Sequence, residues 1–374
     1  MLVYVHFPFC KSKCAYCDFN SYAGCDEATI FSYLTALNRE IDFAAEKFSR
    51  TKIDTVYLGG GTPSVLEGES LGRVLKRLAE KFPAFEPEEI TVEVNPESTT
   101  ADKLKAYRDF GINRISMGVQ SLVDDNLRSV GRLHDAVTAL EKAELAAKIF
   151  DNVSADFIIG LPYDTPDTVR KEIAEIAPLV QHLSVYELTL EEGTALHRRV
   201  CEGSVLLPSD DEVADFLDIA VDVAEENGLK RYEISNFARS GRECRHNFGY
   251  WTREEYIGLG AGAHSLVKTC DGTAPAVAEI RFASPRDIHA YIAGVNCVSS
   301  FDDIPRTEMS VLTPRERTFE KIMLGLRTVK GIDAKLLENK DLSKVRAFFE
   351  FSDGRAALTR QGMAVMNSVL TEIL

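Results

Sequence analysis

Three cysteines lie close together near the N-terminus, within the segment YVHFPFCKSKCAYCDF from Tyr4 to Phe19. Cys10, Cys14 and Cys17 have C-x3-C-x2-C spacing. A structural zinc ion normally takes four ligands, and no second cysteine pair follows this segment. An iron–sulfur cubane is also usually held by four thiolates, so three thiolates leave one iron open to an exogenous ligand. The spacing therefore predicts a [4Fe–4S] cluster with one open iron.

The remaining cysteines do not extend this cluster. They are too sparse for a disulfide scaffold, and in a reducing compartment a close group of cysteines indicates metal binding or redox chemistry. Zinc stays an alternative, with His6 or Cys25 as a fourth ligand, but His6 falls in a predicted strand and Cys25 is distant from Cys17. The five scattered cysteines are Cys25, Cys201, Cys244, Cys270 and Cys297.

Composition excludes several classes of protein. The 374 residues include 43 Lys and Arg against 58 Asp and Glu, a formal net charge of -15. This acidic balance disfavours binding to nucleic acid, and with it a tRNA-modifying function. We find no apolar run long enough to span a membrane and no signal or transit peptide, so we expect a cytoplasmic protein without a membrane span.

Short β-rich runs alternate with helical segments over the first half of the chain. Strand–helix–strand alternation predicts a parallel sheet. Each run is followed by an unusual loop, and functional loops at the carboxyl ends of parallel strands are typical of a barrel mouth. We therefore predict an α/β fold with a partial (β/α)6 barrel. The six runs are Leu2–His6, Thr55–Leu58, Ile90–Val94, Arg114–Gly118, Val153–Ile159 and Leu183–Leu188.

The alternation fades after Gly203, which predicts three parts. Residues 1–203 form the partial barrel. Residues 204–304 form an extension that carries the motifs HNFGYW and GLGAGAHS. Residues 305–374, with TPRERTFEKIMLGLRTVKGI, have the pattern of helix and turn and are expected to form a small α-rich C-terminal domain.

The cysteine spacing after a first β-strand resembles the cluster motif of the radical S-adenosylmethionine (SAM) superfamily, with Tyr16 at its usual aromatic position. The resemblance implies a barrel of that type and implies that S-adenosylmethionine chelates the open iron. The segment GGGTP resembles the family's clamp on the methionine ammonium, through Gly60, Gly61 and Thr62. Glycine lets the backbone approach a ligand closely, although such a segment alone also occurs as a plain turn.

Other polar residues follow the predicted strands and match the cofactor site of one branch of this superfamily. Taken alone, Glu93 fits a solvated surface position better than a binding site, and Arg132 is compatible with a surface ion pair. Asp156 lies in an apolar strand and must be paired if it is buried. Besides Tyr16 and the GGGTP residues, the resemblance assigns five more residues to S-adenosylmethionine binding: Tyr4, Glu93, Gln120, Arg132 and Asp156.

Four segments together, YVHFPFC, YLGGGTPS, NRISMGVQS and IIGLP, resemble the oxygen-independent coproporphyrinogen III oxidase family. Those oxidases carry another cysteine two residues after the third ligand, whereas here Cys17 is followed by Asp18 and Phe19. CDF and H-N-x-x-Y-W instead resemble the HemW branch of haem chaperones. The resemblance implies a protein that binds haem, carries the cluster and S-adenosylmethionine, and passes haem to an acceptor protein. The alternative is the oxidase itself, which decarboxylates propionate side chains.

The motif HNFGYW is the predicted haem site, with His246, Tyr250 and Trp251 as its residues. Imidazole ligates haem iron, and aromatic rings pack on the porphyrin face. A core His–Trp pair is the alternative for these six residues alone, and His134 and His264 are further candidates for an axial ligand. An electron donor is a further expected partner if the cluster is reduced in function.

Overall fold

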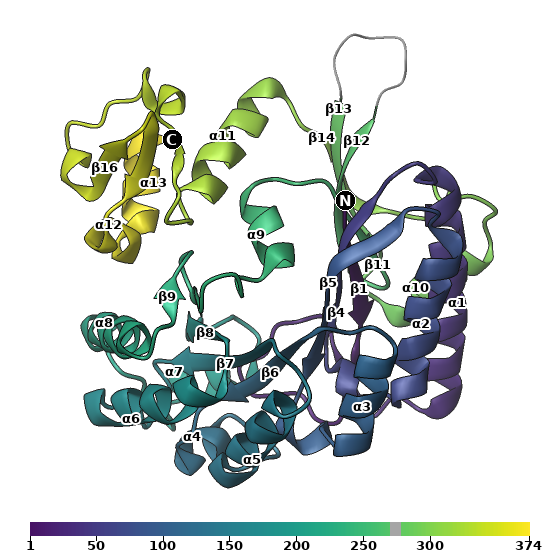
Figure 1. The fold of residues 1–374 in the computed structure, drawn as a ribbon, viewed down its shortest axis with the longest axis horizontal. Coiled ribbons are helices and arrows are strands. Elements are labelled where there is room, and N and C mark those ends of the chain that lie inside the picture. The colour runs from purple at the N-terminus through teal and green to yellow at the C-terminus, as the bar shows by residue number, and fades with distance from the viewer. Residues whose placement is uncertain (270–277) are drawn as a thin grey trace.

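The computed structural model describes residues 1–269 and 278–374, so Cys270 lies outside the described residues. Six parallel strands form the centre of a 12-stranded sheet, in the order in which they occur in the chain (Figure 1). Each predicted β-rich run coincides with one of them, which confirms the parallel sheet. The strands are β1 (Leu2–Phe7), β4 (Ile53–Gly60), β5 (Phe85–Val94), β6 (Arg114–Gln120), β7 (Val153–Ile159) and β8 (His182–Glu187).

Further strands extend both edges of this sheet. At one edge, β10 (Asn236–Ala238) pairs antiparallel with β8, and β9 (Lys230–Arg231) follows. At the other edge, β11 (Tyr256–Leu259) pairs parallel with β1. The antiparallel strands β12 (His264–Thr269), β13 (Ala278–Ala283) and β14 (Thr307–Val311) continue from it. The described sheet ends at β14 and β9, which do not pair, so the predicted partial barrel is confirmed.

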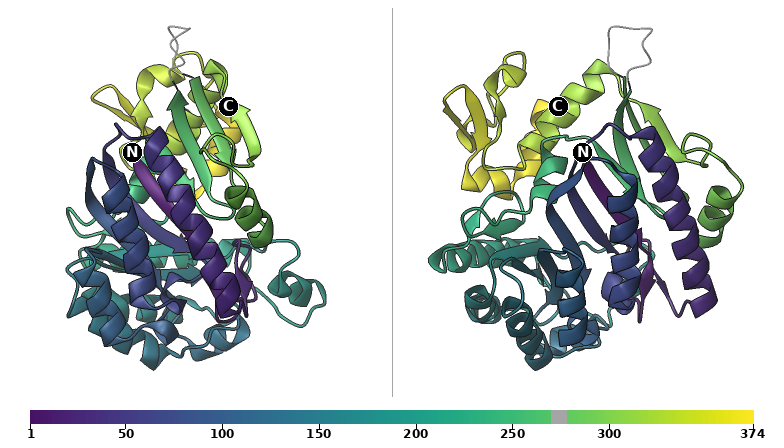
Figure 2. Two further views of the ribbon diagram at one scale, coloured as in Figure 1. Left: turned by 90° about the vertical axis from the view of Figure 1, so that its right-hand side faces the viewer. Right: turned by 45° about the vertical axis from the view of Figure 1, so that its right-hand side comes forward.

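Helices cover the outer face of the parallel strands, and α1 and α2 run alongside each other there (Figure 2). The strands pack between this layer and the barrel interior, and Val3 and Val5 of β1 are 0% exposed. Such continuous apolar strands are expected where both faces of a parallel sheet are covered. These helices are α1 (Glu27–Lys47), α2 (Gly68–Lys81), α3 (Ala101–Asp109), α4 (Asp124–Ser129), α5 (Ala136–Ala147) and α6 (Pro166–Ile176).

The middle of the chain adds four helices and shares the core of the sheet. One apolar core runs from the first strand to Ile304. The helix α8 begins after a capping box in which Ser209 accepts the N–H of Glu212. The four helices are α7 (Ala195–Cys201), α8 (Asp210–Glu226), α9 (Arg245–Trp251) and α10 (Ile288–Asn296).

The C-terminal residues form a small second body, drawn yellow in Figure 1. It contains α11 (Pro314–Gly325), α12 (Arg360–Ala364) and α13 (Met366–Ile373) around an apolar core of its own. The predicted small helical domain is confirmed, and it also contains a three-stranded antiparallel sheet of β15 (Ile332–Asp333), β17 (Arg355–Leu358) and β16 (Phe349–Ser352). The domain boundaries after residues 203 and 304 stay predictions.

No helix in residues 1–269 and 278–374 combines the length and the apolar character that crossing a membrane requires.

Candidate functional site

The three-cysteine loop follows the first strand of the barrel. The short strand β2 (Phe9–Cys10) pairs with β3 (Tyr22–Ala23), and the segment between them carries the other two cysteines. All three cysteines are partly exposed and unbridged. They line a cavity of about 450 Å³, whose wall also includes the carboxyl ends of the parallel strands. The sequence therefore placed the cluster loop at the mouth of the barrel correctly.

The alternative to a cluster at these thiols is a single zinc ion. Within the described residues, no three His, Cys, Asp or Glu side chains are grouped so that they could hold one metal ion. In a cubane each thiolate binds a different iron, so the sulfurs need not meet around one point. His6, the alternative zinc ligand, bonds through one ring nitrogen to the Tyr4 hydroxyl at 2.9 Å and through the other to the Asn20 carbonyl at 2.8 Å.

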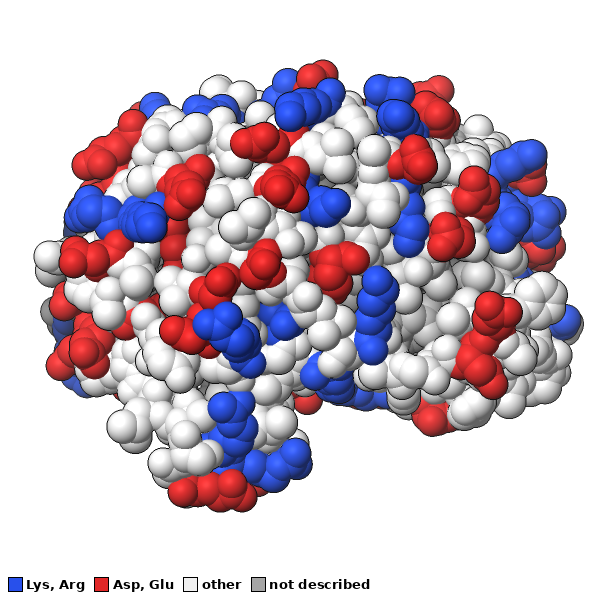
Figure 3. All heavy atoms as spheres, turned by 90° about the horizontal axis from the view of Figure 1, so that it is seen from below, with Lys and Arg blue, Asp and Glu red and all other residues white. Residues whose placement is uncertain are grey.

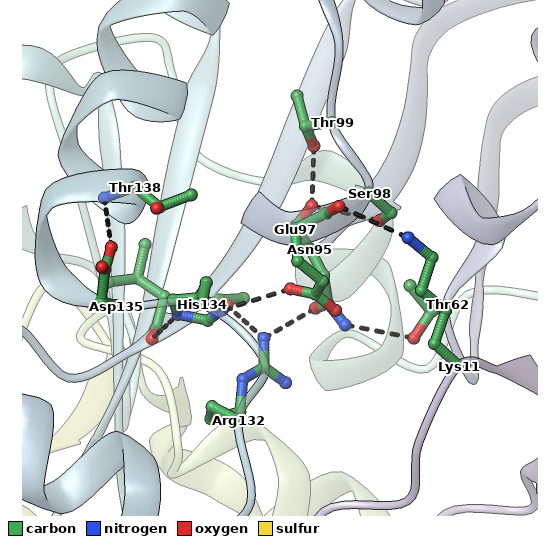
Figure 4. Close-up of polar contacts among 12 residues, drawn as sticks. Lys11, Thr62, Asn95, Glu97, Ser98, Thr99, Arg132, His134, Asp135 and Thr138 are labelled. Carbon is green, nitrogen blue, oxygen red and sulfur yellow. Dashed lines mark hydrogen bonds and ion pairs between the residues drawn. The ribbon is translucent and has the colours of Figure 1, made fainter.

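A chain of polar side chains connects Cys10 with Cys14. The Cys10 Sγ lies 3.4 Å from Thr62 Oγ1, and the Asn95 amide donates to that oxygen at 3.2 Å. Arg132 donates to Asn95 Oδ1 at 2.9 Å (Figure 4) and to the Cys14 Sγ at 3.4 Å. Burial raises the pKa of the Cys10 thiol, and the hydrogen bond with Thr62 opposes that rise. These contacts fit a cluster held by this loop.

Arg132 is therefore not a surface ion pair. Its guanidinium also donates to the Gly118 carbonyl at 2.6 Å, so three acceptors fix its orientation. Asn95, which joins Arg132 to Thr62, is a site residue that we did not predict. Its signal was the NPES loop at the carboxyl end of β5, whose 3₁₀ turn Pro96–Ser98 positions it.

The glycine loop after β4 packs against the cluster loop. The N–H groups of Gly61 and Thr62 donate to the carbonyls of Phe7 and Phe9 at 2.9 and 2.8 Å. A Cβ on Gly61 would lie 2.8 Å from the Phe9 carbonyl oxygen, so only glycine fits this approach. These amides are engaged within the protein, and the Thr62 carbonyl also accepts the N–H of Val65 at 3.0 Å. The role of this loop in binding S-adenosylmethionine stays a prediction.

Glu93 lies beside this loop and is held by two donors. Its carboxylate accepts the Tyr57 hydroxyl and the Gly60 N–H, both at 2.9 Å. Burial raises the pKa of Glu93 to about 7, against the opposing effect of these hydrogen bonds. Glu93 is therefore a carboxyl group whose charge changes near neutral pH, and it is not a solvated surface residue.

Gln120 and Asp156 line the same cavity. Gln120 has a φ of 70°, a left-handed conformation that is uncommon outside glycine and that occurs at functional sites. Asp156 accepts three hydroxyl groups, from Ser116 at 2.8 Å, Ser154 at 3.0 Å and Ser184 at 2.6 Å. The expectation that Asp156 would be paired is met by these serines. Both side chains remain candidates for contacts with a ligand.

The two predicted tyrosines lie on different sides of the site. Tyr16 lines the cluster cavity, and burial raises its pKa. Tyr4 does not line this cavity. Its ring stacks on that of Tyr57 at 6.2 Å, and it borders a second cavity. The structure therefore brings together all the residues predicted for the cluster and S-adenosylmethionine except Tyr4.

The HNFGYW motif lies in α9, which packs against the barrel. Of this helix, Asn247 lines the cluster cavity. His246 is fully buried, and its ring nitrogens bond to the Thr55 hydroxyl at 2.7 Å and the Tyr250 hydroxyl at 2.8 Å. In this arrangement iron ligation by His246 requires that one of these bonds break. Trp251 packs against the Arg327 guanidinium, and Tyr250 lines the second cavity. The haem role of this motif stays a prediction.

His134, a further candidate for an axial ligand, is also engaged. Its Nδ1 lies 3.2 Å from Glu97 Oε2 (Figure 4), and its Nε2 lies 3.1 Å from the Val119 carbonyl oxygen. Two other residues of the cavity escaped the sequence analysis. Asn247, inside HNFGYW, lines the cluster cavity, as does the fully buried Arg114. Arg114 is the first residue of β6, in the segment NRISMGVQS. The sequence analysis treated it as part of a strand and not as a site residue.

Comparison with known proteins finds relatives over the whole chain. Residues 4–176 match the model of the radical SAM superfamily. A protein of Bacillus subtilis (strain 168) named heme chaperone HemW is 32% identical over 99% of this chain and 98% of its own length. A Mycobacterium tuberculosis (strain ATCC 25618 / H37Rv) protein of the same name is 39% identical over 71% of this chain and 69% of its own length.

Among solved structures, the coproporphyrinogen III oxidase (HemN) from Escherichia coli, described as a radical SAM enzyme, has the same fold. Its TM-score is 0.81 at 22% identity, covering 99% of this chain and 89% of that chain.

Proposed function

This chain belongs to the HemW family of haem chaperones, and on that basis we propose that it binds haem and passes the haem to an acceptor protein. The observation that carries the proposal is the length of the match to the Bacillus subtilis relative. It extends over nearly all of both chains, so it includes the barrel, the HNFGYW segment and the C-terminal domain. A match confined to the barrel would support only membership of a broad superfamily.

The protein is a radical SAM protein, with a [4Fe–4S] cluster and S-adenosylmethionine as its cofactors. We assign Cys10, Cys14 and Cys17 to three irons of the cluster and the open iron to S-adenosylmethionine. When bound, this pair supplies one-electron chemistry to the barrel mouth. The three thiols, the arginine beside Cys14 and the closely packed glycine loop support the assignment.

The chain's own residues orient the cofactor. Carbonyl oxygens of the loop Gly60–Thr62 accept the ammonium group, and Glu93 and Asp156 accept hydrogen bonds from hydroxyl groups. Gln120 and Arg132 lie along the same cavity and complete its polar lining. Arg132 donates to Cys14 of the cluster loop and to Asn95. Its side chain therefore links the cluster loop to the wall of the cofactor cavity.

A second candidate function is that of an oxidase. The fold is shared with a coproporphyrinogen III oxidase, which keeps decarboxylation of coproporphyrinogen as the second candidate function. We favour the chaperone because Asp18 and Phe19 stand after Cys17, where the oxidases carry a further cysteine. Phe19, which stands at the position of that cysteine, is 69% exposed.

The proposal extends to partners and location. We propose a haem-accepting protein, and an electron donor where the cluster is reduced, in the cytoplasm. Lys and Arg are mixed with Asp and Glu over the face seen in Figure 3, which offers a nucleic-acid backbone no uniformly basic surface.

One experiment separates the two candidates. Anaerobically reconstituted protein is titrated with haem and followed by absorbance, and the same preparation is incubated with coproporphyrinogen III and S-adenosylmethionine. Saturable haem binding without formation of protoporphyrinogen supports the chaperone. Formation of protoporphyrinogen without haem binding would identify the oxidase.

A further inference from the structure

A second cavity lies beside the cluster cavity. Its volume is about 660 Å³, which is in the range of cavities that enclose organic ligands. It is lined by residues of β1, the end of the cysteine loop, α9, β11, β12, β13 and α11. Asp18, Phe19, Gly60 and Glu93 line both cavities, so a thin wall separates them. Most residues assigned above to the cluster and to S-adenosylmethionine, among them Cys10, Thr62 and Arg132, line the cluster cavity and not this second one.

Large flat side chains form much of this cavity. The rings of Tyr250 and Tyr256 lie edge to face at 4.7 Å, and Tyr4 stands on the neighbouring strand β1. Phe19 is exposed at the boundary with the cluster cavity, and Leu266 and Met323 add apolar surface. Aromatic rings of this kind pack well on the faces of a planar apolar ligand.

The same cavity has a cation at its edge that is free to pair with a ligand. Arg253 Nη2 forms ion pairs with Glu279 Oε2 at 2.7 Å and with Glu320 Oε2 at 2.8 Å. Arg286 is exposed, and in the described part of the chain it makes one long hydrogen bond, to the Asp18 carbonyl at 3.4 Å, and no ion pair. A guanidinium in this state suits a carboxylate ligand, which it can bind through two parallel hydrogen bonds.

One imidazole in this cavity can accept a metal. His6 is bonded at both ring nitrogens, as described above. The side chain of His264 is 52% exposed, and its closest charged contact is Nδ1 to Glu308 Oε2 at 4.0 Å. Its Nε2 has no partner among the residues that the structure describes. An imidazole with a free nitrogen and a carboxylate near the other nitrogen is the usual form of a metal-ligating histidine.

We propose that this second cavity is the haem site, with His264 as an axial ligand of the iron and Arg286 paired with a propionate. The inference rests on the proposed function and deepens it, because a planar, apolar dianion that contains iron matches the aromatic walls, the free cation and the free imidazole together. The thioether of Met323 lies in the same cavity and is a candidate for the second axial position. His246 is then a positioning residue, since its Nε2 holds the hydroxyl of Tyr250.

The test uses the full-length protein with its cluster reconstituted. Haem is titrated into the wild type and into His264→Ala and Arg286→Glu, and affinity and the Soret band are recorded. Matched controls are His289→Ala and Arg170→Glu, which change an exposed histidine and an exposed arginine outside this cavity. We expect His264→Ala to weaken haem binding about tenfold or more and to shift the Soret band, and Arg286→Glu to weaken binding about tenfold, with both controls near wild type.

The outcomes separate this inference from the function on which it rests. If the wild type binds haem and His264→Ala keeps wild-type affinity and spectrum, the site is elsewhere and the chaperone proposal stands. If Arg170→Glu weakens binding as much as Arg286→Glu, the charge effect is nonspecific and the propionate assignment is wrong. If the wild type itself does not bind haem, the proposed function and this inference both fail.

Discussion

The backbone N–H of Gly60 donates to the carboxylate of Glu93 at 2.9 Å, and this pair forms part of the wall between the two cavities. Gly60 has a φ of 116°, which side chains rarely tolerate, and a Cβ there would lie 2.5 Å from the ring of His6. The hydrogen bond between Gly60 and Glu93 therefore depends on glycine, because any side chain at residue 60 would clash with His6.

Gly60→Val should weaken S-adenosylmethionine binding about tenfold or more, because the branched side chain must displace His6 and the loop. Gly193→Val is the matched control, since Gly193 also has a positive φ but its Cβ would meet nothing within 4 Å. Both changes also place a side chain at a positive φ, which is strained at either position. Equilibrium binding by the folded variants is the measurement. Equal affinity in the two variants would remove the loop from the site.

Replacing any one of Cys10, Cys14 or Cys17 by Ser should abolish the [4Fe–4S] cluster, because two thiolates leave two irons without protein ligands. Iron and sulfide content and the absorbance spectrum after anaerobic reconstitution are the readouts. Cys201→Ser and Cys297→Ser, at exposed thiols away from the loop, should keep the full cluster. Full iron content in a single variant of the loop would overturn the assignment of that cysteine.

Affinity for S-adenosylmethionine should rise with pH through about 7 if Glu93 contacts the cofactor. Burial raises the pKa of Glu93 from 4.5 to about 7, with Asp156 adding to the rise and Tyr57 and Arg114 opposing it. Below pH 7 the carboxyl is neutral, and above it the carboxylate attracts the cationic cofactor. Between pH 6 and 8 the ionised fraction changes about tenfold, and affinity should follow.

The same shift has a consequence for stability. Because the folded state holds the Glu93 proton more tightly than the unfolded chain, the contribution to the free energy of unfolding is present below pH 4.5 and is lost as pH rises to about 7. Glu93→Gln should remove both dependences, whereas Glu225→Gln, at an exposed position of α8, should keep them. A pH-independent cofactor affinity in the wild type would exclude Glu93 from the contact.

His246→Ala should lower the free energy of unfolding by roughly 2–4 kcal/mol, because it leaves a cavity and removes the partner of two hydroxyls, those of Thr55 and Tyr250. Urea denaturation compared with His289→Ala measures this. The Soret band of bound haem distinguishes the roles. A positioning residue changes affinity with little shift of the band, whereas loss of an iron ligand shifts it.

The sequence was sufficient where the determinants are local. The six parallel strands are continuous apolar runs bounded by turns, and the three thiols of the cluster loop are neighbours in the chain. The helix α3 shows the limit of such precision. In the sequence, Thr99-x-x-Asp102 forms a weak capping-box pattern, which predicts that the helix begins after Thr99. In the structure the Thr99 hydroxyl donates to the Asn95 carbonyl, and Thr100 is the residue that caps the helix.

The sequence was insufficient where distant segments meet. The edge strand β9 and the C-terminal strand β15 have two residues each. Such short strands show no alternation of apolar and polar residues, so the sequence does not predict them. The second cavity joins Tyr4 to Met323, from opposite ends of the chain, and no motif links them. The motif HNFGYW indicated a histidine of importance, but only packing reveals that both nitrogens of His246 are already bonded.

The shared wall has a thermodynamic consequence for a protein that carries two ligands. A ligand on either side meets the same backbone at Gly60 and the same carboxyl group of Glu93. If occupancy of one cavity alters this wall, linkage requires that each ligand change the affinity of the other by the same factor. Release of the cargo would then depend on the state of the cofactor.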